Sequence, residues 1–175
     1  MHFDEPTLSR IKNCEEELEA RGWLRSIAKS DFELGAKVVA TLYANKNLGV
    51  IVSGAYGSGK TAFVRRAFPH ARFYQMPMAE GVLDPDYGIP EGDVILDDMG
   101  AEHSVNDFGI RKEPFADFVV RFHANPRRGR LIITTNLSTQ EFNDRYGGRV
   151  VSRLKDLCVA THFTGGDKRE WTIIK

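Results

Sequence analysis

The sequence predicts a three-layer α/β/α sandwich, in which a central parallel sheet is covered by helices on both faces. Two observations support this fold class. Short apolar runs that end in glycine or polar residues are typical of buried parallel strands, as in LGVIVSG (48–54), DVILDD (93–98) and LIITTN (131–136). Helical segments separate these runs, and strands that alternate with helices form parallel sheets through crossover connections.

The expected elements follow from hydrophobic spacing and from glycine or proline at their ends. The expected helices cover residues 6–30, 33–45, 61–68, 114–123 and 139–157, the last with a break at Gly147 and Gly148. The expected strands cover residues 48–54, 71–76, 93–98, 131–136, 158–163 and 170–175. Residues 77–92 and 125–130 are expected to be loops.

Composition limits the class of protein. The chain has 175 residues, 42% of them hydrophobic, which suits one domain with one ordinary core. Its 24 basic and 24 acidic residues cancel, so net charge offers no argument for nucleic acid or an anionic membrane. Cys14 and Cys158 are too few for a disulfide framework and lack metal-ligand spacing. Without a recognisable signal peptide or membrane span, we expect a cytoplasmic protein.

Residues 54–61, GAYGSGKT, fit the Walker A pattern of phosphate-binding loops and lie between an expected strand and an expected helix. Glycines let backbone N–H groups turn toward phosphate oxygens, and the helix adds its positive N-terminal end. The pattern predicts a P-loop NTPase in which Lys60 reaches the β- and γ-phosphates of ATP and Thr61 holds Mg²⁺. The residues expected at the nucleotide are Gly54, Ala55, Tyr56, Gly57, Ser58, Gly59, Lys60, Thr61 and Ala62.

Two carboxylates, Asp97 and Asp98, follow an apolar run at the end of a strand, where such sheets bind ligands. Asp97 is expected to hold Mg²⁺ through its water shell, and Asp98 to polarise the attacking water. A shift of one residue in strand register would exchange these roles. With the Walker A loop, this pair predicts hydrolysis of ATP rather than binding alone.

Three further polar residues complete the candidate set. Asn136, at the end of another apolar strand, is expected to orient the lytic water or to contact the γ-phosphate. Arg149 and Arg153 are four residues apart and therefore lie on one face of a helix. An arginine beside the γ-phosphate stabilises transition-state charge, and it can come from a neighbouring subunit. The alternative is that both arginines are solvated on the helix surface.

Five segments carry a resemblance to a known family: DDMGAE (97–102), VNDFG (105–109), LIITTNL (131–137), RYGGRVVSRL (145–154) and FTGGDKRE (163–170). In this order they resemble AAA+ ATPases of the DnaC/IstB group, which are helicase-loader-like proteins and transposition helpers of bacteria and phages. The resemblance covers about residues 48–170. It implies that Lys60 and Thr61 form the Walker A pair, Asp97 and Asp98 the Walker B pair, and Asn136 sensor 1.

The resemblance also implies that Arg149 is the arginine finger, with Arg153 as a second candidate. It assigns no firm role to Glu102, which stands at a motif position. Arg169 resembles a terminal motif arginine, or is a cation of a hairpin turn. The implied organisation is an AAA+ core over residues 48–175 without a separate helical lid domain, preceded by a short N-terminal helical segment over residues 1–47.

The partners implied by the resemblance are further copies of the chain, with ATP at the subunit interfaces, and a replicative helicase or a transposase. In the loader group, helices that contact single-stranded DNA commonly precede the Walker B strand. The corresponding segment 77–92 holds three prolines and three glycines, so we expect a loop there, without such helices. The arginines that could contact nucleic-acid phosphates instead, or be solvated or lie at a subunit contact, are Arg65, Arg66, Arg127, Arg128 and Arg130.

Three functions fit these motifs. The first is an ATP-hydrolysing AAA+ module that acts on a protein partner at DNA. One alternative is a non-hydrolysing adaptor that uses ATP as an assembly switch. The other is a small-molecule kinase with the same phosphate loop, against which the Asp97–Asp98 pair and the strand ending at Asn136 argue.

Overall fold

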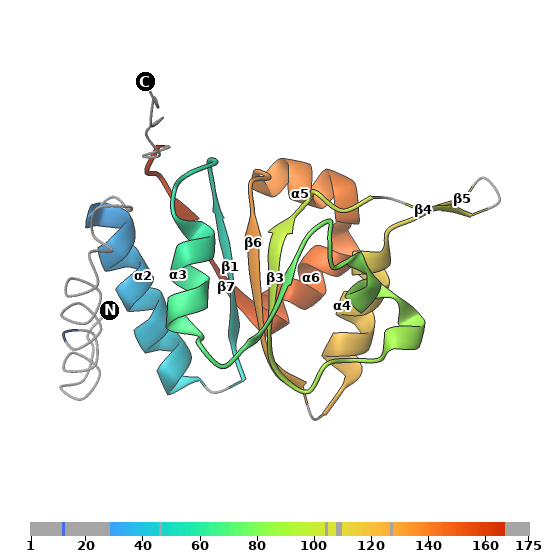
Figure 1. Ribbon diagram of the computed structural model, residues 1–175, viewed down its shortest axis with the longest axis horizontal. Helices are drawn as coiled ribbons and strands as arrows, with labels where there is room; N and C mark the ends of the chain where they lie inside the picture. Colours follow the sequence, from blue (N-terminus) through green and yellow to red (C-terminus); the bar gives the residue numbers. More distant parts are fainter. Residues whose placement is uncertain are drawn as a thin grey trace, which may run out of the picture.

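A five-stranded parallel sheet forms the centre of the protein, with helices on both faces (Figure 1). The computed structural model describes residues 12, 29–45, 47–103, 105–107, 110–126 and 128–166. The strands are β1 (Gly49–Gly54), β2 (Arg72–Gln75), β3 (Gly92–Met99), β6 (Arg128–Thr135) and β7 (Cys158–Phe163). Their order in the sheet is β2-β3-β6-β1-β7, which confirms the predicted fold class and places β6 between β1 and β3.

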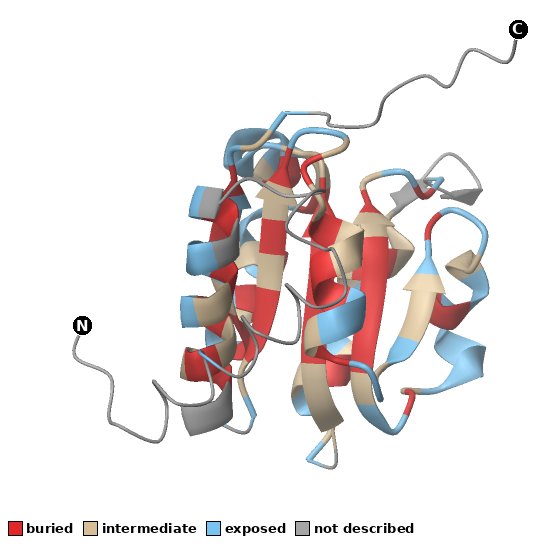
Figure 2. Ribbon diagram, turned by 60° about the vertical axis from the view of Figure 1, so that its left-hand side comes forward, coloured by how far each residue is buried: buried red, intermediate tan, exposed pale blue. Residues whose placement is uncertain are grey.

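Both faces of the sheet are apolar, because the central strands contain continuous apolar runs whose alternate residues point to opposite sides. On one face Val50, Ile95 and Ile132 pack together from three neighbouring strands. On the other face Leu96 and Ile133 belong to a second cluster. Figure 2 shows the buried residues concentrated in the strands and on the inner sides of the helices.

Five helices enclose the sheet in the described part of the chain. α2 (Lys29–Ala44) and α3 (Lys60–Ala67) cover one face, where Leu42 and Phe63 are buried. α4 (Pro114–Ala124), α5 (Thr139–Tyr146) and α6 (Gly148–Leu157) cover the other (Figure 1). α5 begins with a reciprocal cap in which Ser138 and Glu141 each accept the backbone N–H of the other.

Most expected elements are present, with two corrections and one unexpected addition. The second helix begins at Lys29 rather than residue 33. Residues 125–130 are only partly a loop, because β6 already begins at Arg128. Arg130 forms an ion pair with Asp93 at 2.6 Å and thereby extends the contact between β3 and β6. The structure also contains an unexpected antiparallel hairpin of β4 (Val105–Asp107) and β5 (Ile110–Lys112).

The segment 77–92 contains no α-helix, in agreement with its proline and glycine content, but it is more regular than the expected loop. Two short 3₁₀ helices, η2 (Glu80–Leu83) and η3 (Pro85–Tyr87), occupy it. Val82 and Leu83 are buried in the same cluster as the apolar side of α4. The segment is therefore fastened to the core rather than free to form a separate pair of helices.

Several expectations concern residues outside the described ranges. These are the expected helix over 6–28 apart from residue 12, the strand over 170–175, and the residues Cys14, Arg127 and Arg169. In the ranges that the structure describes, no helix is long and apolar enough to cross a membrane.

Gly49→Ala is expected to destabilise the fold by about 1–3 kcal/mol, the usual cost of overpacking a rigid core. A Cβ atom at this position of β1 would lie 1.9 Å from the carbonyl oxygen of Leu131, and the backbone of β6 cannot easily withdraw. Urea unfolding of the variant measures the loss. Gly81→Ala is the control, since a Cβ atom there meets nothing within 4 Å, and equal effects of the two substitutions would contradict the prediction.

Candidate functional site

The phosphate loop, residues 54–61, joins β1 to α3 at the end of the sheet where the parallel strands finish (Figure 1). Gly57 and Gly59 adopt left-handed backbone angles, with φ of 76° and 90°. At Gly54, φ is 147° and a Cβ atom would lie 2.4 Å from the carbonyl oxygen of Phe163. The sharp turn of the loop, and its close approach to β7, therefore require glycine.

The loop fits an anionic phosphate chain. Gly59 caps α3 without any side-chain hydrogen bond, so the first N–H groups of the helix have no side-chain competitor for an anion. Within the described part of the chain, the buried hydroxyl of Ser58 has no hydrogen-bond partner. The Nζ atom of Lys60 donates to the carbonyl oxygens of Gly54 and Ala55 at 2.9 and 2.8 Å, which places its charge inside the loop.

Two neighbouring strands bring polar side chains to the loop. The Nζ atom of Lys60 donates to Oδ1 of Asn136 at 2.7 Å, just after the end of β6. The hydroxyl of Thr61 donates to the carboxylate of Asp97, at 3.0 and 3.1 Å from its two oxygens. The structure thus brings together Lys60, Thr61, Asp97 and Asn136, four of the residues singled out in the sequence.

The contact between Thr61 and Asp97 fits Mg²⁺. Hydroxyl and carboxylate oxygens are ligands that this cation prefers, and Mg²⁺ commonly binds through one or two carboxylates together with substrate phosphates and water. Within the described residues no group of three or more His, Cys, Asp or Glu side chains could hold a metal by itself. A site with one carboxylate is consistent with that finding, because the phosphates would supply further oxygens.

Burial raises the pKa of Asp97 above its usual range, since no part of this residue is exposed to solvent. Hydrogen bonds from Thr134 and Thr61 oppose the rise, and the nearby carboxylate of Asp98 adds to it. The charged form of Asp97 is therefore less favourable in the fold than it is in water. A bound cation would favour that form.

An irregularity in the sheet separates the two aspartates. Leu96 pairs with Ile133 and Met99 with Thr135, so β3 holds one extra residue between these pairs. Asp98 occupies the bulge with a left-handed φ of 58°, which is uncommon for a residue other than glycine. Its backbone N–H donates to the hydroxyl of Thr134 at 2.9 Å, and this hydroxyl donates to Asp97 at 2.6 Å. The register thus places Asp97, not Asp98, against Thr61.

The structure keeps the two candidate arginines apart from this cluster. Arg149 is exposed on α6, and Arg153 is half-buried and donates to the carbonyl oxygen of Arg149 at 3.3 Å. α6 packs through Val150 and Leu154 on the face of the sheet opposite α3. Among the described residues, no hydrogen bond or ion pair joins either arginine to the phosphate loop.

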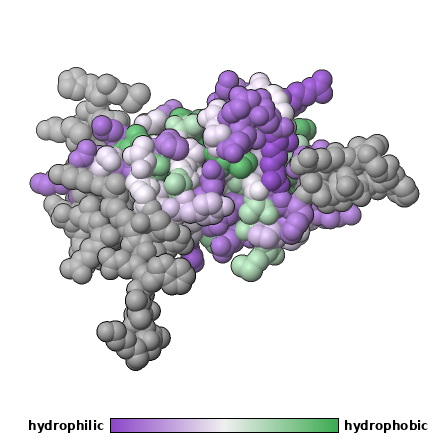
Figure 3. Space-filling model, turned by 90° about the horizontal axis from the view of Figure 1, so that it is seen from above, coloured by the Kyte–Doolittle hydropathy of each residue, from purple (hydrophilic) through white to green (hydrophobic). Residues whose placement is uncertain are grey.

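The described surface at the phosphate-loop end of the molecule is more hydrophilic than hydrophobic (Figure 3). Figure 3 views the molecule from the end at which the phosphate loop lies, and its described surface shows only small hydrophobic spots. Tyr56, at the tip of the loop, is 71% exposed, whereas Ala62 is half-buried in α3. Tyr56 is therefore accessible to a ligand or partner.

The arginines that were candidates for contact with nucleic-acid phosphates make contacts within the protein, where the structure describes them. Arg128 donates to the carbonyl oxygens of His123 and Asn125 at the end of α4, at 3.3 and 3.2 Å. Arg130 pairs with Asp93. The guanidinium of Arg65 lies 4.7 Å from the centre of the Phe73 ring. These contacts favour a structural role for Arg128 and Arg130 over contact with nucleic-acid phosphates.

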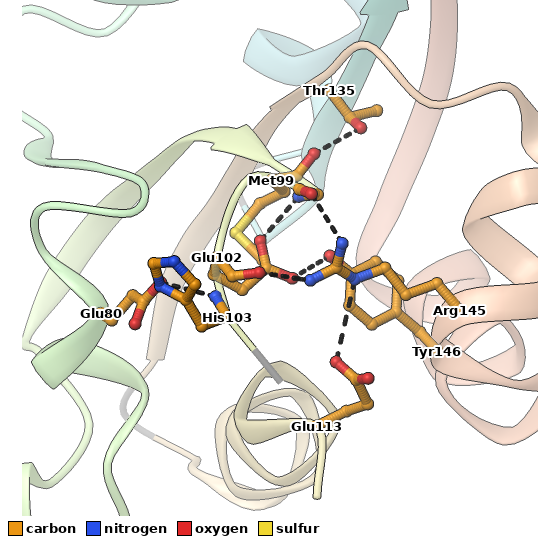
Figure 4. Close-up of polar contacts among 9 residues, drawn as sticks. Glu80, Met99, Glu102, His103, Glu113, Thr135, Arg145 and Tyr146 are labelled. Atoms are coloured by element: carbon orange, nitrogen blue, oxygen red, sulfur yellow. Dashed lines mark hydrogen bonds and ion pairs between the residues drawn. The ribbon is translucent and has the colours of Figure 1, made fainter. Parts of the chain in front are cut away.

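The buried polar contacts of two carboxylates near the site, Glu102 and Asp31, were not predicted from the sequence. Glu102 is buried in contact with Arg145 and Tyr146, in the loop that follows Asp98 (Figure 4). Asp31 is also buried and accepts the backbone N–H groups of Thr164 and Gly165 at 2.9 and 2.6 Å. It thereby ties the start of α2 to the segment after β7. The motif position of Glu102 was a signal in the sequence, but Asp31 lies 133 residues from Thr164 and offered none.

The order of the parallel strands and the glycine-rich loop between β1 and α3 give the chain the fold of a P-loop NTPase. Among solved structures, the chain is similar to a crystal structure of the DnaC helicase loader, with a TM-score of 0.55 and 17% sequence identity. The match covers 78% of this chain and 92% of that one. No family model and no curated protein matches the sequence. At this identity the likeness shows the fold alone, which agrees with the fold implied by the DnaC-like sequence segments.

Asp97→Asn is expected to make the nucleotide-free fold more stable than the wild type at alkaline pH. A carboxyl with a raised pKa stabilises the fold below its unfolded pKa, and this contribution is lost as pH rises through the folded pKa. The neutral amide does not titrate, so the advantage of the variant should grow as pH rises above about 4, the usual pKa of an aspartate carboxyl. Thermal unfolding of the variant and the wild type without nucleotide, over this pH range, measures the difference in stability.

The control for this prediction is Asp117→Asn, which changes an exposed carboxylate on α4. Its stability relative to the wild type should not follow the same trend. A constant loss of stability in Asp97→Asn at every pH would show that hydrogen bonding, rather than the buried charge, dominates at this position.

Proposed function

We propose that the protein binds ATP with Mg²⁺ and hydrolyses it as a self-associating AAA+ module, acting on a protein partner at DNA in the manner of a helicase loader. The observation that carries the proposal is the meeting of three strand ends at one loop. Lys60 from the loop contacts Asn136 beyond β6, and Thr61 contacts Asp97 in β3. The buried carboxylate and the amide add, beside the phosphate loop, the groups that would hold Mg²⁺ and orient a water molecule.

Each residue has a role that its position supports. Lys60 would exchange its carbonyl contacts for the β- and γ-phosphate oxygens, and the first N–H groups of α3 would face the same oxygens. Thr61 and Asp97 would hold Mg²⁺, directly and through water. A cation held there would supply charge neutralisation for the phosphates. Asp98 would polarise the attacking water, and Asn136 would orient it beside the ammonium of Lys60.

Arg149 is the arginine finger in this proposal, and Arg153 is the second candidate. The exposed position of Arg149 on α6 suits a residue that reaches the ATP of a neighbouring subunit. The partner would be a replicative helicase, by analogy with the loader whose fold the chain shares, or a transposase. Single-stranded DNA is a weaker candidate as a direct ligand, because segment 77–92 holds only short 3₁₀ helices and Arg128 and Arg130 have contacts within the protein.

Arg149→Ala is expected to reduce the rate of ATP hydrolysis by roughly a thousandfold or more while nucleotide affinity stays nearly unchanged. Lys60→Ala should lose nucleotide binding, but it retains Arg149. Mixing the two inactive variants should therefore restore part of the activity, because a wild-type loop then meets a wild-type arginine at some interfaces. Phosphate release by the mixture against total protein concentration measures this rescue.

The matched control is Lys155→Ala, which removes another exposed cation from the same helix and should leave hydrolysis unchanged. A rate per subunit that is independent of concentration, with no rescue in the mixture, would contradict a shared site. Binding of ATP without phosphate release, even with partner and single-stranded DNA present, would favour the non-hydrolysing adaptor. Transfer of phosphate to a small molecule instead of water would favour the kinase.

A further inference from the structure

The carboxylate of Glu102 is buried four residues after Asp98, and it accepts hydrogen bonds from two segments of the chain (Figure 4). One oxygen accepts the backbone N–H of Gly100 at 2.7 Å. The other accepts the hydroxyl of Tyr146 and lies 3.1 Å from a guanidinium nitrogen of Arg145. Burial and the nearby Glu102 raise the pKa of Tyr146, so its hydroxyl remains a proton donor.

Arg145 binds the same loop through the backbone. Its guanidinium donates to the carbonyl oxygen of Gly100 at 2.6 Å and to that of Glu102 at 2.5 Å. It also forms an ion pair at 3.8 Å with Glu113, which precedes α4. One side chain at the end of α5 therefore fixes the loop after β3 and the start of α4, as Figure 4 shows.

Packing alone does not explain this cluster. Two carboxylates and one guanidinium are withdrawn from water, which is costly, and apolar side chains of similar size often stabilise a fold as well or better. The arrangement instead imposes a defined geometry, because the planar fork of arginine meets backbone carbonyls only in fixed directions. What it fixes is the path of residues 100–102 immediately beyond Asp98.

The cluster also lies next to the element that carries Arg149. Arg145 and Tyr146 are the last two residues of α5, and Gly147 follows with a left-handed φ of 81° before α6 begins. At the other end of the loop, the hydroxyl of Thr135 donates to the carbonyl oxygen of Met99 at 2.6 Å. The loop after Asp98 is thus held by β6 on one side and by the corner between α5 and α6 on the other.

We propose that Glu102, Arg145 and Tyr146 form a positioning unit that sets the loop that follows Asp98 and the α5–α6 corner that precedes Arg149 in one fixed arrangement. The inference rests on the proposed ATP hydrolysis. Glu102 acts through the loop and the corner, without touching the nucleotide. Asp98 of one site and Arg149 of the next are then adjusted together, by one buried carboxylate.

Glu102→Gln tests the unit, because the amide keeps the shape but removes the charge that Arg145 binds. The turnover number for ATP should fall about tenfold to a hundredfold, as for other residues that orient a catalytic group through its neighbours. The affinity for a fluorescent ATP analogue should stay unchanged. Arg145→Lys should also lower the turnover number, since lysine keeps the positive charge but loses the planar fork of the guanidinium.

The matched control is Asp93→Asn, which breaks the ion pair with Arg130 at the opposite end of β3 and β6. It should lower stability without changing the turnover number. If both variants reduced turnover only in proportion to the folded fraction, or if Glu102→Gln weakened ATP binding with turnover unchanged, the positioning role would be overturned.

Hydrogen exchange in the full chain without nucleotide separates this inference from the proposed function. Glu102→Gln should raise the rate of amide exchange in residues 99–103 and also in residues 146–150. Asp93→Asn should raise it in neither segment. If the wild type binds ATP but never hydrolyses it, the proposed function fails. Hydrogen exchange alone then tests whether Glu102 couples residues 99–103 to residues 146–150. A response confined to one of the two segments overturns the inference, whatever the hydrolysis assay shows.

Discussion

A single hydroxyl group, that of Thr134, supports the geometry of the whole site. It donates to the buried carboxylate of Asp97 and accepts the backbone N–H of Asp98, so it holds the bulge that separates the two aspartates. Thr134 lies in β6, which runs between the strand of the phosphate loop and the strand of the aspartates. The same strand therefore also delivers Asn136 to Lys60, and the site depends on β6 being central.

The sequence predicted the parts of this structure that local patterns specify. Apolar runs located the strands of the sheet, and the glycine pair at 147 and 148 located the break between α5 and α6. The bulge at Asp98 was not predictable, because it depends on a threonine 36 residues further along the chain. The links of Asp31 with Thr164 and of Glu102 with Tyr146 are likewise between distant residues, and isolated polar residues carry no periodic signal.

The site concentrates features that are unfavourable for folding by themselves. Asp97 is buried with a raised pKa, Asp98 has a left-handed backbone, and the ammonium of Lys60 is nearly inaccessible to solvent. The apolar clusters on both faces of the sheet offset these costs. Departures from local rules at one end of an otherwise regular sheet are typical of functional sites, where geometry is maintained at the expense of stability.

The way in which α6 is anchored determines how Arg149 can move. Val150, Leu154 and Leu157 bury one side of this short helix in the core of its own subunit, and the arginine extends from the other side. The side chain projects from this packed helix and not from a loop, so closure of a loop would not bring it into place. Under the proposed function, the angle at which two subunits dock would set the rate of hydrolysis. A partner that tilted one subunit against the next would then change the rate of hydrolysis.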